Sequence, residues 1–100
     1  MMKDIAICYN FKFSLTIKKR KGKDYKSHTI VGVGFSYWNA LWDVHYKLKN
    51  RKTEILKINS LIVLRIALAV QDEKSVAINL ADHLPVIPDD LNIELHRIPK

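Results

Sequence analysis

The chain has 100 residues, 48% of them hydrophobic and 27% charged, with a formal net charge of +7 at pH 7. This composition predicts one folded domain over residues 1 to 100 and excludes a disordered chain. The single cysteine, Cys8, excludes an internal disulfide, and no run is apolar enough for a signal peptide or a membrane span. We therefore expect a cytoplasmic protein that does not engage a membrane.

Apolar and polar residues alternate strictly over residues 5 to 17. A period of two held over this length is typical of a β-strand with one buried face. Residues 18 to 24 form a lysine-rich loop with Gly22 at its turn, and residues 25 to 35 read as the returning strand. The start of the chain therefore predicts an antiparallel hairpin.

Two glycines in the returning strand leave a strip without side chains. Gly32 and Gly34 alternate with the larger Val31, Val33 and Phe35, so both glycines belong to one face of the strand. A strip of this kind favours either close packing of another element or a close approach by a ligand.

The segment after the hairpin is the one convincing amphipathic helix. Ser36 is a suitable N-cap because its hydroxyl can accept a backbone N–H of the first turn, and we expect the helix to end near Leu48 to Asn50. At about 100° per residue, seven side chains share one arc, which we expect to be buried against Phe11, Phe13 and the other odd-numbered residues of the first strand. The seven are Tyr37, Trp38, Leu41, Trp42, Val44, His45 and Leu48.

The second half of the chain is rich in β-branched residues. We expect strands over residues 54 to 58, 61 to 70, 76 to 80 and 92 to 98. The polar pair Asn59-Ser60 separates the first two of these strands, and a helix over residues 54 to 70 is the alternative. The predicted fold class is α+β: an antiparallel sheet of five or six strands with a single amphipathic helix packed on one face.

No arrangement of residues indicates catalysis or metal binding. Ser36, Asp43 and His45 lie too close together on one helix to form a catalytic triad, and no glycine-rich phosphate loop is present. Metal-ligand spacing is missing among the histidines, which are His28, His45, His83 and His96. We therefore expect a non-enzymatic protein that uses no cofactor and no metal.

One short motif is similar to a known family. The run Gly32-x-Gly34-x-Ser36-x-x-x-Ala40 resembles the strand-to-helix junction of double-stranded-RNA-binding domains, which also place a β-hairpin before that junction. That family has phosphate-contacting lysines just after the serine, whereas this chain has two aromatic residues there. The chain is therefore not assigned to the family.

Positive charge is concentrated in the first half of the chain. Residues 1 to 53 carry 12 Lys and Arg against 3 Asp and Glu, a net +9, whereas residues 54 to 100 carry 5 against 7, a net −2. If the helix packs back along the sheet, its basic end returns to the lysine-rich hairpin tip. The candidate binding residues are Lys18, Lys19, Arg20, Lys21, Lys23, Lys26, Lys47, Lys49, Arg51 and Lys52, with Tyr25 and Tyr46 for stacking.

This predicted basic end has three interpretations. It fits a nucleic-acid-binding module that contacts phosphates with low sequence specificity. It also fits a small inhibitor or adaptor of the phage or mobile-element type, which docks on an acidic protein surface and blocks a nucleic-acid-processing enzyme or complex. The plainest interpretation is a solvated loop plus cations favoured by the helix dipole. The sequence leaves the partner, the choice of RNA or DNA and homodimer formation open.

Overall fold

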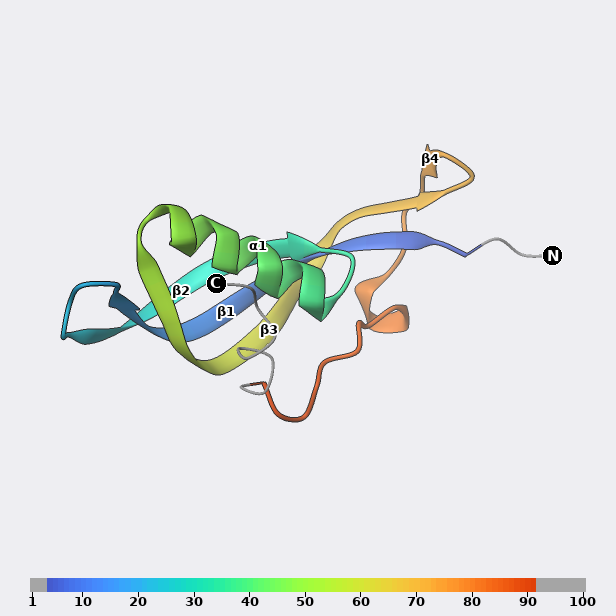
Figure 1. The fold of residues 1–100 in the computed structure, drawn as a ribbon. Helices are drawn as coiled ribbons and strands as arrows, with labels where there is room; N and C mark the ends of the chain where they lie inside the picture. The colour runs from blue at the N-terminus through green and yellow to red at the C-terminus, as the bar shows by residue number, and fades with distance from the viewer. Residues whose placement is uncertain (1–3, 92–100) are drawn as a thin grey trace.

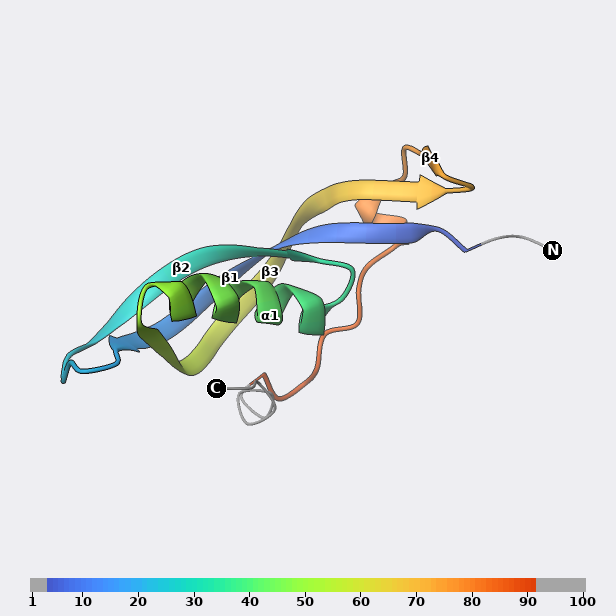
Figure 2. The ribbon, with the colours of Figure 1, turned by 45° about the horizontal axis from the view of Figure 1, so that its top comes forward.

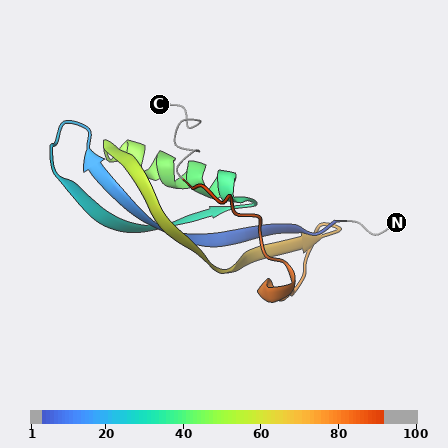
Figure 3. The same ribbon diagram turned by 90° about the horizontal axis from the view of Figure 1, so that it is seen from below.

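The computed structural model describes residues 4 to 91, and the strand predicted over residues 92 to 98 lies outside them. The elements are β1 (Ala6–Lys19), β2 (Tyr25–Gly34), α1 (Tyr37–Asn50), β3 (Thr53–Gln71), β4 (Lys74–Ser75) and the short 3-10 helix η1 (Leu80–Asp82). The strands form one antiparallel sheet in the order β2-β1-β3-β4, and α1 lies on one face (Figures 1 and 3). The predicted α+β class is confirmed.

The described sheet has four strands, fewer than the five or six predicted. The two strands expected over residues 54 to 58 and 61 to 70 are one strand, β3, which pairs with β1 along its length. Asn59 does not end this strand, because its Nδ2 donates to Thr16 Oγ1 at 3.0 Å. Asn59 also lies at one of four register shifts between the two strands, where a bulge accommodates an extra residue.

The strand predicted over residues 76 to 80 is also wrong. After the two-residue β4, Val76 N still donates to the carbonyl of Ala69 at 2.9 Å, and the chain then leaves the described sheet and enters η1. The side chain of Asn79 accepts from Ala81 N at 3.2 Å and caps η1. Such a local side-chain bond offers the backbone an alternative to strand pairing.

The hydrophobic core lies between β1 and α1. Side chains of β1 alternate as predicted, and its buried members are Tyr9, Phe11, Phe13, Leu15 and Ile17. The helix contributes Tyr37, Ala40, Leu41, Val44 and Leu48, and β3 contributes Ile58. The rings of Phe13 and Tyr37 lie 6.1 Å apart. Ser36 caps α1 as predicted, accepting from Asn39 N at 3.3 Å, and the helix ends at Asn50.

The glycine strip of β2 is where the helix comes closest to the sheet. A Cβ on Gly32 would lie 2.4 Å from the carbonyl oxygen of Ala40, and one on Gly34 would lie 2.6 Å from the backbone nitrogen of Ala40. No side chain fits at these distances. Of the two interpretations of the strip, close packing of another element is the one found.

The expectation that both tryptophans are buried is wrong. Trp38 is 45% exposed and Trp42 is 48% exposed. Because the helix touches β2 through Ala40, its buried line is turned away from the tryptophans. At about 100° per residue, Trp38 lies on the flank of this line and Trp42 lies near the opposite side. Leu41 is buried as predicted, and His45 is half-buried beside Trp42, with ring centroids 6.0 Å apart.

Two helix side chains bond to the outer edge of β2. The carboxylate of Asp43 accepts from Val33 N at 3.0 Å, and the Lys47 ammonium donates to the Val31 carbonyl at 3.0 Å. Asp43 and Lys47 also pair with each other at 2.9 Å. Part of this edge, which in an open sheet offers unpaired backbone groups, is thereby occupied.

The chain after η1 returns toward the helix (Figure 2). Two core tyrosines hold this return segment: Tyr9 Oη donates to the carbonyl of His83, and Tyr37 Oη donates to the carbonyl of Leu91 at 3.1 Å. Leu80 and Leu91 also pack against the core. The return segment is therefore tied down at both ends.

Candidate functional site

The hairpin tip and the end of the helix meet at one end of the molecule. Arg20 N, just past β1, donates to the carbonyl of Lys52 at 2.9 Å, which joins the tip to the connection between α1 and β3. Lys52 has a left-handed φ of 55°, which helps to close this tight connection. The two basic clusters identified in the sequence are therefore neighbours.

A pocket of about 480 Å³ lies between the hairpin and the helix end. Ile17 and Leu48, both nearly fully buried, give it an apolar floor. We call it the basic pocket, and its described lining consists of Ile17, Lys18, Lys19, Gly22, Lys23, Asp24, Lys26, His28, Leu48, Arg51 and Thr53. Its volume is in the range of small-ligand sites.

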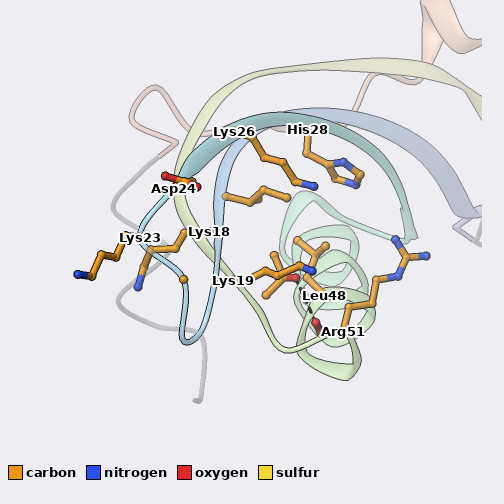
Figure 4. A pocket seen from close by; sticks show the side chains of 11 residues that line it. Lys18, Lys19, Lys23, Asp24, Lys26, His28, Leu48 and Arg51 are labelled. Atoms are coloured by element: carbon orange, nitrogen blue, oxygen red, sulfur yellow. Dashed lines mark hydrogen bonds between the residues drawn. The ribbon is translucent and has the colours of Figure 1, made fainter.

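Strand register explains which side chains reach the basic pocket. Lys26 pairs with Ile17, and His28 pairs with Leu15, so both lie on the helix-facing side of β2. The polar groups of Lys19, Lys26, His28 and Arg51 point into the hollow (Figure 4). Asp24 is the one carboxylate among the described lining residues.

His28 was not among the predicted site residues. It lies two positions after Lys26 and therefore on the same face of β2, which is the sequence signal that could have identified it. From the sequence alone, this histidine is only a candidate metal ligand that lacks the required spacing. In the structure its imidazole, which can form hydrogen bonds to a ligand, lines the same hollow as Lys19, Lys26 and Arg51.

Several predicted site residues do not contribute their charge to the basic pocket. Lys23 lines it but points away from the hollow (Figure 4), and the Lys18 ammonium lies 3.7 Å from the carboxylate of Glu54. The Lys47 ammonium is bonded at the β2 edge. The predicted residues that are not in the described lining are Arg20, Lys21, Tyr25, Tyr46, Lys47, Lys49 and Lys52.

The two tyrosines proposed for stacking lie outside the basic pocket. Tyr25 is 68% exposed and Tyr46 is 59% exposed, and the described lining contains no aromatic ring other than the imidazole of His28. Base stacking needs a flat ring beside the phosphate site. The pocket therefore provides cations and hydrogen-bond donors rather than a stacking platform.

A second pocket, of about 390 Å³, lies at the other end of the helix. We call it the apolar pocket, and its described lining consists of Tyr9, Phe35, Ser36, Trp38, Leu84, Pro85, Val86 and Pro88. None of these carries a formal charge. Burial raises the pKa of the Tyr9 phenol above its ordinary value, and its hydroxyl donates to the carbonyl of His83.

No pattern in the sequence indicates the apolar pocket, because half of its lining comes from the return segment after η1. Hydrogen bonds from Tyr9 and Tyr37 to backbone carbonyls hold that segment in place. Bonds between residues so far apart in the chain leave no periodic pattern in the sequence. The exposed Phe35 and Trp38 form the opposite wall, although Trp38 was expected to be buried.

Neither a metal site nor a membrane-spanning helix is indicated in the part of the chain that the structure describes. No helix within residues 4 to 91 is long and apolar enough to cross a membrane. The same residues contain no group of three or more His, Cys, Asp or Glu that could hold a metal ion.

Comparison with known proteins finds no matching family model, curated protein or solved structure.

Proposed function

We propose that this protein is a non-enzymatic nucleic-acid-binding module that contacts phosphate through the basic pocket. The observation that supports this most is the convergence of Lys19, Lys26 and Arg51 on one hollow (Figure 4). Each cation that neutralises a phosphate releases a counterion from the nucleic acid, which favours binding. The buried floor of Ile17 and Leu48 lowers the local dielectric and strengthens the attraction.

The same site favours low sequence specificity. Phosphate contacts position a protein on nucleic acid but carry no sequence information, whereas base edges are read by groups that enter a groove or stack. The described lining has no aromatic ring apart from the imidazole of His28, so it offers little surface on which a base could stack. Affinity is therefore expected to depend on charge more than on sequence.

Neutralising the basic pocket should reduce the salt dependence of binding. The triple variant Lys19→Ala, Lys26→Ala, Arg51→Ala should lower the slope of log Kobs against log salt by roughly 0.9 per lost contact on a duplex, or 0.7 on a single strand. These side chains are exposed, so the fold should survive. Fluorescence anisotropy of a labelled oligonucleotide, titrated at several salt concentrations, measures the slope.

A matched control removes the same charge elsewhere. Lys12, Lys57 and Arg65 are exposed on strands β1 and β3, and their alanine triple variant has the same net charge as the pocket variant. Its slope should stay close to that of the native protein. An equal reduction of the salt slope in both triple variants would mean that binding depends only on the net charge of the protein. A native protein with no salt-dependent affinity for nucleic acid would end the proposal.

A second candidate function is binding to another protein as an inhibitor or adaptor, which the apolar pocket favours. Phe35 and Trp38 are 61% and 45% exposed there, and Val86 is 89% exposed. Exposed aromatic residues grouped without charges resemble the centres of protein interfaces, where tryptophan often dominates the binding energy.

The two functions predict different variant behaviour. A protein partner docked on the apolar pocket should be retained from nuclease-treated lysate by the native chain and by the basic-pocket triple variant. It should be lost with Phe35→Ser plus Trp38→Ser. Quantitative mass spectrometry of the three samples, followed by titration with the purified partner, measures this. Retention by the serine variant, or release by nuclease, would contradict docking at this pocket.

A further inference from the structure

We infer that the basic pocket receives the terminal phosphate of a nucleic-acid end in preference to an internal phosphodiester. This inference rests on the proposed function and specifies its ligand. The cations are concentrated at one place: Lys19 comes from the end of β1, Lys26 from the start of β2, and Arg51 directly follows α1. All three point into the same hollow rather than forming a track along the surface (Figure 4).

A terminal phosphate matches this concentration of charge better than an internal one. A phosphate monoester carries about −1.5 to −2 charges at pH 7 and presents three strong acceptor oxygens. An internal phosphodiester carries a single charge and has two unbridged oxygens. Three converging cations and the ring of His28 therefore offer more donors than one internal phosphate can use.

The shape of the basic pocket also favours a chain end. Its floor is closed by Ile17 and Leu48, and the hairpin tip, with Gly22 and Asp24, forms one side. A volume of about 480 Å³ is of the size that holds one small ligand. A terminal phosphate is attached to one nucleoside, whereas an internal phosphate is flanked by two, which need more room at the mouth of the pocket.

The helix C-terminus does not oppose an anion here as strongly as an uncapped end would. The last carbonyls of a helix carry partial negative charge. In α1, Arg51 N donates to the carbonyl of Leu48, and Lys52 N donates to that of Lys49, each at 3.0 Å. These bonds satisfy carbonyls next to the pocket, and the side chain of Arg51 adds a full positive charge at the same place.

The test compares oligonucleotides of one sequence that differ only at their ends. Linear single strands with a 5′-phosphate, a 3′-phosphate or two hydroxyl ends are titrated against the full chain, together with a closed circle of the same sequence. We expect a phosphorylated end to bind about tenfold more tightly than hydroxyl ends, as one added charge-assisted contact provides. The circle should bind like the strand with hydroxyl ends.

Variants connect this preference to the pocket. Lys26→Ala and His28→Gln should each reduce the preference for a phosphorylated end, whereas Lys12→Ala, on β1 outside the pocket, should keep it. Circular dichroism shows whether each variant is folded. A preference that persists in both pocket variants would overturn the assignment to this pocket.

The remaining outcomes separate this inference from the proposed function. Equal, salt-dependent binding of all four oligonucleotides would overturn the terminal-phosphate inference and leave nucleic-acid binding intact. No salt-dependent binding of any of them would overturn both. A nucleoside 5′-monophosphate that competes as strongly as the phosphorylated strand would show that the ligand is a small phosphorylated molecule, which also overturns the inference.

Discussion

Phe13→Ala is expected to lower the free energy of unfolding by about 3 to 5 kcal/mol, a large part of the stability of a small domain. Phe13 is fully buried, and its ring lies 6.2 Å from that of Phe11 and 6.1 Å from that of Tyr37. Removing it leaves a cavity beneath the helix. Trp42→Ala, although it removes a larger side chain, should cost only about 1 kcal/mol, because Trp42 is half exposed.

Urea denaturation followed by far-ultraviolet circular dichroism measures the free energy of unfolding of the native protein and of both variants. Circular dichroism is preferable to fluorescence here, because Trp42→Ala removes one of the two tryptophan fluorophores. Native, Phe13→Ala and Trp42→Ala proteins should share one m-value if the variants unfold from the same structure. A Trp42→Ala cost as large as that of Phe13→Ala would mean that the helix buries its tryptophan side after all.

The contrast between these two residues shows what periodicity predicts and what it leaves open. Alternation along β1 identifies its buried face, because a strand has only two faces. A helix can rotate about its axis, and the hydrophobic arc alone placed Trp38 and Trp42 inward. The contact between Ala40 and the glycines of β2 determines which side of the helix faces the sheet. A hydrophobic arc is defined mainly by large side chains, so it does not reveal a contact made by alanine and glycine.

The position of the candidate site was predictable from the sequence, but the side chains that line it were not. Strand and helix lengths placed the hairpin tip beside the helix end, and the bond from Arg20 N to the Lys52 carbonyl joins them. Charge counting did not show which cations share a hollow. Lys47 bonds at the β2 edge, and Lys18 lies beside Glu54, whereas His28 contributes without a charge in the count. These differences come from side-chain direction and long-range pairing.

The predicted number of strands was wrong because long-range pairing and local side-chain bonds also decide where a strand ends. Asn59 and Ser60 lower the strand propensity of their segment, but β3 lies against β1, where the amide of Asn59 bonds to Thr16. Tertiary pairing therefore overrides the local preference. The reverse holds for residues 76 to 80, where the Asn79 side chain makes a local bond at the start of η1.

Gly32→Ala should destabilise the protein by about 3 kcal/mol, although the same change normally stabilises an exposed strand position by reducing the entropy of the unfolded chain. The new Cβ would lie 2.4 Å from the Ala40 carbonyl oxygen and 2.7 Å from Val44 Cγ2. Because the nearest atom belongs to the helix backbone, the steric clash can be relieved only if α1 moves away from β2. A loss of stability on Gly32→Ala would therefore indicate that α1 packs against this glycine, whereas a gain would indicate that it does not.

Gly22→Ala is the matched control, since a Cβ there would meet nothing closer than Lys19 Cβ at 3.4 Å, an ordinary contact. Its stability should stay within about 0.5 kcal/mol of the native value, measured by the same urea titration. Gly32→Ala should also weaken binding at the basic pocket under conditions where it is still folded, because displacing α1 moves Arg51 and Leu48 away from Lys26. A Gly32→Ala protein as stable as Gly22→Ala would show that the helix does not rest on the glycine strip, and the position of Arg51 would then need another cause.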